Sequence, residues 1–410
     1  MNKRRKKKKQ KKQNKGMWFL SVLILVIALG CLVMLWVARD GNSENKDGKE
    51  LETVDKSRVV NEIVETEPQQ SEVQQKDQNT EGETVDLGEV NETDPEVTMV
   101  FGGDICFHDE YSNMYQLSAR GGDISGCFSP DLFTVMQEAD VFMVNNEFTY
   151  TTRGEPTPDK AYTLRSRPEN VQLLKDMGVD IVSLANNHTY DYGEISLLDT
   201  LDTLQNASVL YAGAGRNLEE ASAPVYVEHD GMTIAFVAAT QIERLDNPDT
   251  KGATGSSAGV FRCWDVEPLL QTVKVASQNS DFVVVYIHWG TESTDVTDWA
   301  QTSQAPRIAQ AGADLIVGDH PHVLQGIDVV EGAPVVYSVG NLWFNSKAMD
   351  SCLIQVTAGR DGIRKLRYIP ARQENATTSM LMGSEKARVL SYIQSLSPNV
   401  TIDGDGVITD

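Results

Sequence analysis

The chain has 410 residues and a formal net charge of −23, with 36 basic and 59 acidic side chains. Four of its five cysteines follow residue 38, which is too few for a small disulfide scaffold, and the chain is long enough to fold on its own buried core. The acidic excess argues against nucleic acid as a partner, because phosphate backbones bind basic surfaces.

The N-terminus has the pattern of a membrane anchor. Residues 1–16 hold ten Lys or Arg and no acid, and residues 17–38 carry no charge. At ~1.5 Å per residue the uncharged stretch is long enough for a helix that spans a ~30 Å hydrocarbon core. The positive-inside bias predicts a cytoplasmic tail at 1–16 and a single-pass cell-membrane protein whose main domain is extracellular. A cleaved signal peptide has the same order of regions, but its apolar part is usually shorter.

Residues 39–95 are predicted to form a disordered acidic linker. After Arg39 this stretch holds 17 acids and five bases, with few large apolar side chains. Such a segment cannot bury enough surface to fold, and repulsion between its charges extends it.

From residue 96 onwards, short apolar runs alternate with helical patterns, which predicts one α/β domain over residues 96–410. Strands are expected at residues 97–102, 141–145, 180–184, 233–238, 282–287 and 314–317. Helices are expected at residues 130–139, 168–177, 193–205, 265–276 and 301–311. Two antiparallel hairpins are expected, from 327–330 with 334–339 and from 352–356 with 363–368.

Polar side chains follow five of the expected strands directly. They are Asp104, Glu147, Asn187, His288 and His320. In an α/β sheet, ligands collect beyond the carboxyl ends of the strands, so we expect these side chains to form one site. Imidazole and carboxylate groups are common ligands of divalent transition metals, and the sequence therefore predicts a metal site.

The local motifs suit this chemistry. Asp104 follows two glycines, which let the backbone bring a carboxylate close to a cation. Glu147 can bridge two ions with its two oxygens. His320 and His322 flank a proline, so two imidazoles can serve two neighbouring metals. Taken singly, each residue also fits a blander role, as a turn residue, an N-cap or a core histidine.

Six motifs occur in the order GGD, NNE, ANNHTYDYG, HWGTE, HPHVLQG and YSVGN, from Gly102 to Asn341. This series resembles the bacterial CapA family of poly-γ-glutamate capsule synthesis proteins. The resemblance covers about residues 97–368. It implies a calcineurin-like metallophosphoesterase fold, in which mixed sheets are flanked by helices, together with a membrane anchor.

The resemblance also implies two divalent metal ions, of Mn, Fe or Zn. The ligands of one ion would be Asp104, Glu147 and His322, and those of the other Glu147, Asn187, His288 and His320. Glu147 would bridge the two ions. His188 would be the catalytic residue, which donates a proton or stabilises developing oxyanion charge.

Four further side chains are expected to contact the substrate. Arg165 and Arg167 match a family segment and can clamp an anionic group. Asn145 and Glu292 belong to the motifs that contain Glu147 and His288. An anionic polymer such as poly-γ-glutamate is the expected substrate or cargo.

The chain departs from ordinary phosphoesterases at the first metal site. They place a histidine two positions after the first aspartate, where this chain has Cys106, with His108 two positions further on. Cys106 and His108 are therefore possible metal ligands. Either a thiolate fills the gap or the first metal site is incomplete.

Three functions remain open from the sequence. The protein can be an assembly factor for capsule polymer, working with other synthase subunits in the membrane. It can be an extracytoplasmic metal-dependent phosphoesterase or hydrolase of another anionic cell-envelope substrate, or a non-catalytic binding module whose metal site has decayed. Residues 96–410 hold 42 acids and 20 bases, so a polyanion would need local positive charge from metal or arginine.

Overall fold

The computed structural model describes residues 94–242 and 251–410. The expected cytoplasmic tail at 1–16, the membrane helix at 17–38 and the linker up to residue 93 lie outside the described residues. Within the two described ranges, no helix is long and apolar enough to cross a bilayer.

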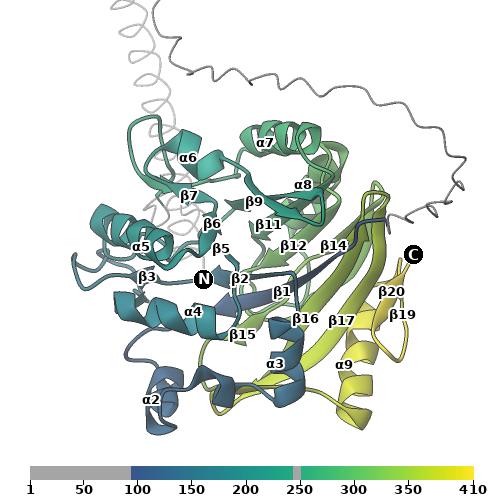
Figure 1. Cartoon of the computed structure of the whole chain (residues 1–410), viewed down its shortest axis with the longest axis horizontal. Coiled ribbons are helices and arrows are strands. Elements are labelled where there is room, and N and C mark those ends of the chain that lie inside the picture. Colours follow the sequence, from purple (N-terminus) through teal and green to yellow (C-terminus); the bar gives the residue numbers. More distant parts are fainter. Residues whose placement is uncertain (1–93, 243–250) are drawn as a thin grey trace, which may run out of the picture. The chain divides into compact units, whose positions relative to one another are not determined.

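The first sheet has ten strands, parallel on one side of β1 (Val97–Ile105) and antiparallel on the other (Figure 1). Its parallel strands are β1, β2 (Val141–Asn146), β5 (Ile181–Ser183) and β6 (Leu210–Ala212). On the other side of β1 the antiparallel strands are β16 (Met349–Gly359), β17 (Gly362–Glu374), β20 (Val407–Thr409) and β19 (Thr401–Ile402). Two strands branch from this order, β15 (Asn341–Trp343) on β1 and β18 (Thr377–Met380) on β17.

The second sheet has six strands, in the order β13-β14-β12-β11-β9-β8. Its parallel strands are β9 (Met232–Thr240), β11 (Phe282–His288), β12 (Leu315–Asp319) and β14 (Ala333–Val336). Its antiparallel edges are β8 (Val225–His229) and β13 (Ile327–Val330). Two small pairs complete the strands, β3 (Thr149–Tyr150) with β4 (Arg165–Ser166), and β7 (Ala214–Gly215) with β10 (Gly259–Val260).

Three buried apolar clusters define the layers of the domain. The middle cluster joins Phe101 of β1 to Tyr286 of β11, so the two sheets pack face to face. The outer face of the first sheet is covered by α2 (Ser112–Ala119), α3 (Pro130–Gln137), α4 (Gln172–Asp176) and α5 (Glu194–Ala207). The outer face of the second sheet is covered by α7 (Glu267–Gln278) and α8 (Trp299–Gln310), which lie beside β9, β11 and β12 in Figure 1.

The remaining helices are short or peripheral. They are α6 (Leu218–Ser222), α9 (Gly383–Leu396), and the 3-10 turns η1 (Ile124–Cys127) and η2 (Pro168–Val171). Val389, Leu390 and Ile393 of α9 join the middle cluster, so this helix closes one side of the space between the sheets.

The α/β alternation expected from the sequence agrees with this architecture. All six expected strands and both hairpins are present, with ends that differ by a few residues. The helix expected at 168–177 is a 3-10 turn that continues into α4. This mixed α/β domain, with helices outside two sheets, fits a metallophosphoesterase-like fold.

The polar motifs lie at the carboxyl ends of parallel strands from both sheets. Asp104 is the last residue but one of β1, and Glu147 directly follows β2. In the second sheet, His288 ends β11 and Asp319 ends β12. The close approach of atoms from these residues shows that the strand ends of the two sheets converge on one place.

Candidate metal centre

Glu147 lies where the carboxyl ends of strands from both sheets converge. Its side chain is fully buried, and its Oε1 atom faces the Nε2 atoms of three histidines. The separations are 3.9 Å to His188, 3.8 Å to His288 and 4.0 Å to His322. These distances are too long for hydrogen bonds, and neither carboxylate oxygen of Glu147 has a hydrogen-bond partner among the described residues. A buried carboxylate without partners is costly, so the arrangement fits a bound cation.

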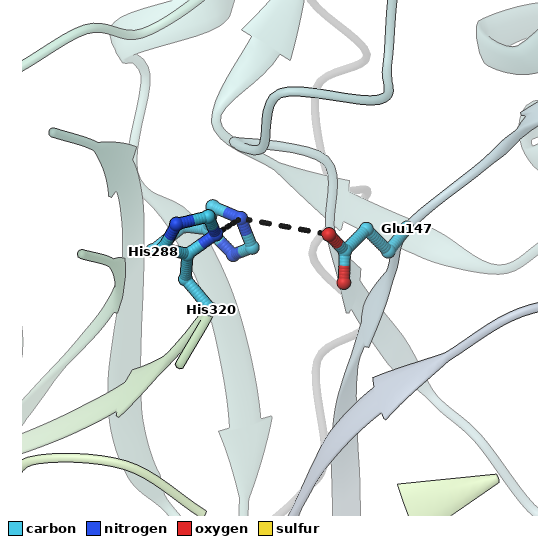
Figure 2. Close-up of side chains that lie close together, drawn as sticks. All are labelled: Glu147, His288 and His320. Atoms are coloured by element: carbon cyan, nitrogen blue, oxygen red, sulfur yellow. Dashed lines mark hydrogen bonds and ion pairs between the residues drawn. The ribbon is translucent and has the colours of Figure 1, made fainter. Parts of the chain in front are cut away.

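The first group of candidate ligand atoms belongs to Glu147, His288 and His320, all within 4.8 Å of one another (Figure 2). His320 Nδ1 lies 3.0 Å from His288 Nε2, and Asn187 Oδ1 lies 2.8 Å from the same nitrogen. Ligands that each lie about 2.0–2.2 Å from one ion are about 3–4 Å apart. The spacing of these nitrogen and oxygen atoms therefore fits a single divalent ion.

The second group belongs to Asp104, Glu147 and His322. His322 Nδ1 lies 3.0 Å from Asp104 Oδ2 and 2.8 Å from Asn341 Oδ1. Glu147 is a member of both groups, so its carboxylate is shared between them. These residues are among those that the family resemblance assigns to the two metals, and the structure brings them together.

The backbone around the paired histidines is unusual. His320 has φ of 92° and His322 has φ of 58°, in the left-handed region that non-glycine residues rarely adopt. Such conformations persist only where the surroundings hold them, and they concentrate at functional sites. The strained turn brings both imidazoles to the same side, toward Glu147.

The buried carboxyl groups influence one another strongly. Burial, with the charge of Asp104, raises the pKa of Glu147 well above its usual range. The pKa of Asp319 is raised well above its usual range for the same two reasons. Burial also opposes ionisation of Asp104, but its hydrogen bond with His322 and the charges of His322 and His288 leave its pKa lowered.

The pKa is lowered for two of the clustered histidines and raised for a third. Burial, reinforced by His320, lowers the pKa of His288 well below its usual range. Burial and the charge of His322 lower the pKa of His320 to about 3. For His322, burial is outweighed by Glu147 and Asp104, which raise its pKa to about 10. His288 and His320 are thus neutral imidazoles, the form that binds metal.

Asp319 is a site residue that the sequence reasoning missed. Its Oδ1 lies 3.0 Å from His288 Nδ1, so the carboxylate can accept a hydrogen bond from this nitrogen while Nε2 faces the cluster. A carboxylate behind a ligating histidine fixes the orientation of the imidazole. The signal in the sequence is that Asp319 ends an apolar strand and directly precedes His320.

His188 is held by a neighbouring carboxylate. Its Nδ1 lies 2.7 Å from Asp191 Oδ2, and its Nε2 faces Glu147. Burial lowers its pKa, although Asp191 acts in the opposite direction. The imidazole therefore presents Nε2 to the space above Glu147, where it can exchange a proton with a bound molecule.

The two expected arginines differ in their surroundings. Arg165 is half-buried, its guanidinium lies 4.4 Å above the ring of Tyr192, and it makes no ion pair with the described residues. Arg167 is exposed and lies 3.7 Å from Asp109 and 3.8 Å from Glu169. Arg165 is thus the better placed of the two to accept an anionic group. Exposed Glu292 contributes to the raised pKa of Glu147, so its charge reaches the cluster.

Asn145 has a different role from the substrate contact expected. The side chain is fully buried, its Nδ2 donates to Asp104 Oδ1 at 2.9 Å, and its Oδ1 accepts from Asn186 at 2.9 Å. Both the nitrogen and the oxygen of the amide form hydrogen bonds within the protein, so Asn145 helps to orient the carboxylate of Asp104.

Cys106 and His108 do not complete the first metal site. Neither contributes an atom to the groups of converging ligands in the described part of the chain. Cys106 is buried in the apolar cluster beside the first sheet, and burial raises the pKa of its thiol well above the usual range. His108 Nδ1 lies 2.9 Å from the carbonyl oxygen of Arg165.

Comparison with known proteins identifies the relatives of this chain. Residues 98–346 match the family described as bacterial capsule synthesis protein PGA_cap. The PGA biosynthesis protein CapA of Bacillus subtilis is 34% identical over 238 residues, which are 57% of this chain and 60% of that protein. The capsule biosynthesis protein CapA of Bacillus anthracis is 33% identical over 239 residues, which are 56% and 57% of the two chains.

More distant matches also exist. A probable polyglutamine synthesis accessory protein of Mycobacterium tuberculosis is 30% identical over 211 residues, 50% of this chain and 55% of that protein. The chain thus spans at most about three fifths of the length of these relatives. A hypothetical protein from Thermus thermophilus, of known structure, superposes with a TM-score of 0.41 and 14% identity over 67% of this chain and 99% of that chain. On the match over residues 98–346, the chain belongs to the PGA_cap family of bacterial capsule synthesis proteins.

Proposed function

We propose that this protein acts outside the cell in the synthesis or export of an anionic capsule polymer, poly-γ-glutamate, through a site that holds two divalent metal ions. The observation that carries the proposal is the position of Glu147, a fully buried carboxylate that faces three histidine nitrogens and has no hydrogen-bond partner among the described residues. Family membership supports the polymer, because the relatives are capsule and poly-γ-glutamate proteins by name.

The residues fit two ions of Mn, Fe or Zn. Glu147 belongs to two of the three groups of converging atoms, and imidazole with carboxylate is the donor set that these metals prefer. When bound, such a pair of ions would supply the positive charge that stabilises negative charge developing on a substrate. His188 would hold or release a proton at Nε2, steadied by Asp191 at its other nitrogen.

A polyanion can bind to this acidic protein only where there is local positive charge. Arg165 is half-buried and has no carboxylate partner among the described residues, so its guanidinium can pair with a carboxylate of the polymer. A guanidinium binds phosphate equally well, which favours a second candidate, hydrolysis of a phosphoester or another anionic envelope substrate.

The proposed setting is the cell membrane. The uncharged stretch at 17–38 would anchor the protein by one helix, the linker at 39–95 would separate the domain from the bilayer, and the domain at 96–410 would meet the other synthase subunits outside. Fusion of alkaline phosphatase after residue 95, active only outside the cytoplasm, would test this topology. An inactive fusion with normal expression would reject it.

The metal content can be measured on the full-length chain by elemental analysis. We expect two equivalents of Mn, Fe or Zn per chain, and a loss of both in Glu147→Gln, because this residue is shared. Glu138→Gln is the matched control, since Glu138 is an exposed carboxylate at the end of α3. Full metal content in Glu147→Gln, or none in the wild type, would contradict the two-metal site.

The catalytic role is tested in cells. Polymer production with His188→Ala is compared with the wild type, with a strain that lacks the chain, and with His229→Ala. His229 lies on edge strand β8, where it pairs with Asp140 at 3.4 Å. We expect His188→Ala to resemble the deletion and His229→Ala to resemble the wild type. Wild-type production with His188→Ala would leave an assembly role without catalysis.

A further inference from the structure

Lys160 is a buried lysine next to the candidate metal centre. Its side chain is 5% exposed, and it lies in the segment between β3 and β4. Lysine is rarely buried unless a carboxylate pairs with it. Its partner is Asp191, whose Oδ1 lies 2.5 Å from the ammonium nitrogen and whose side chain is fully buried.

The same ammonium group has a second contact. Nζ of Lys160 also donates to the backbone carbonyl of Asn187. Asn187 is a candidate ligand, whose Oδ1 lies 2.8 Å from His288 Nε2. One lysine thus holds both the residue before His188 and the carboxylate behind His188.

Asp191 is fixed from several directions. Its Oδ2 accepts from Leu164 N at 2.6 Å and lies 2.7 Å from His188 Nδ1, which leaves Oδ1 to Lys160. The backbone carbonyl of Asp191 accepts from Thr157 N at 2.8 Å. Three residues of the 151–164 segment therefore clamp the turn that carries Asn187 and His188.

We propose that Lys160 is a positioning residue that sets Asn187 and the His188–Asp191 pair against the metal centre at the same time. The inference rests on the proposed function, in which Asn187 is a ligand and His188 handles a proton. Lys160 acts through these neighbours, because its ammonium group donates to Asp191 Oδ1 and to the Asn187 carbonyl. Its removal would leave a buried carboxylate unpaired on one side and a carbonyl without its donor.

The test uses the full-length chain with Lys160→Met, which keeps the length of the stem and removes the charge. Lys175→Met is the matched control, since Lys175 is exposed in the last turn of α4. The chain has six histidines, so the ring signals of protein labelled with ¹⁵N-histidine can be assigned by single substitution. Zn²⁺ affinity is measured by calorimetry on the same samples.

For Lys160→Met we expect loss of the hydrogen-bonded His188 Nδ1 proton signal and a fall of about tenfold in Zn²⁺ affinity, with a cooperative thermal transition retained. Lys160→Gln, which keeps a donor, should retain part of both properties. An unchanged His188 signal and unchanged affinity in Lys160→Met would overturn the inference. So would loss of cooperative unfolding in both variants, because Lys160 would then support the fold as a whole.

These measurements are independent of polymer production. If cells with His188→Ala make normal polymer, the proposed catalytic role fails, while the histidine signal and the Zn²⁺ affinity still decide whether Lys160 positions Asn187 and His188. If Lys160→Met changes neither, the positioning role fails and the proposed function stands.

Discussion

Gly103 and Gly340 approach so closely that a Cβ atom on Gly103 would lie 1.7 Å from the carbonyl oxygen of Gly340. The same carbonyl accepts the backbone N–H of Asp104 at 3.0 Å. The bare backbone at 103 thus lets β1 and the start of β15 lie side by side. Asp104 and Asn341 are the next residues of the two strands, and the contact between the glycines therefore brings both side chains to His322.

Gly103→Ala should therefore strain the site and the fold together. The new methyl group would push β1 from β15, and overpacking of this kind costs about 1–3 kcal/mol of unfolding free energy. Urea unfolding of the full-length chain measures this loss. Gly126→Ala is the control, because a Cβ there meets no atom of the described residues within 4 Å, and a change within about 0.5 kcal/mol is expected. Equal stability of the two variants would show that the strands part easily.

Asp319→Asn should weaken metal binding without unfolding the protein. The carboxylate accepts from His288 Nδ1, and an amide in its place no longer fixes the imidazole in one orientation. We expect Zn²⁺ affinity to fall about 10–100-fold, as measured by calorimetry. The control is Asp131→Asn, an exposed position in the first turn of α3. If the Zn²⁺ affinity of Asp319→Asn equals that of the control, Asp319 does not contribute to metal binding through His288.

The two arginines provide a matched comparison of substrate binding. Arg165→Ala should weaken binding of a poly-γ-glutamate fragment about tenfold, because a charge-assisted hydrogen bond contributes about 1.5–3 kcal/mol. Arg167→Ala should have a smaller effect, since Asp109 and Glu169 already occupy its guanidinium. Fluorescence anisotropy with a labelled fragment measures both. A larger effect at Arg167 would reverse the order that the ion pairs indicate.

The convergence of these polar side chains could be predicted because it depends on strand ends. Asp104, Glu147 and His288 each sit where an apolar run stops, and parallel strands place such ends at one edge. The two glycines before Asp104 predicted a close backbone approach, and the structure shows that a Cβ atom on Gly103 would clash with the backbone of Gly340. Periodicity and turn residues are local properties, so the sequence shows them directly.

What could not be predicted is where each side chain points. Asp319 belongs to the apolar strand β12 by sequence, and only the register with β11 sets it behind His288. Asn145 was expected to face the substrate, but its pairing partners lie inside the protein. Cys106 lies just past β1, where the chain enters the core, and spacing alone does not show this. Helix α9 was missed because its apolar face covers a gap that exists only after both sheets form.

Helix α9 is attached to β16 by a charged contact outside the family match. Arg388 donates to both oxygens of Asp350 at 2.8 Å, and Arg372 adds a bond of 3.0 Å. The hydrogen bond to Arg388 lowers the pKa of Asp350, and burial opposes this only in part. The contact therefore stabilises the folded protein only while Asp350 is ionised.

This contact gives a stability difference with a defined pH dependence. A carboxyl group whose folded pKa lies below its unfolded value of about 3.9 stabilises the fold above that value, and the contribution disappears as pH falls through the folded pKa. Asp350→Asn should thus cost about 1 kcal/mol at pH 7, a modest figure because the arginines are partly exposed. Urea unfolding should show that the difference in unfolding free energy between the wild type and Asp350→Asn narrows as the pH is lowered below about 4. A stability difference that stays constant below about pH 4 as well would mean that Asp350 acts through packing and not through its charge.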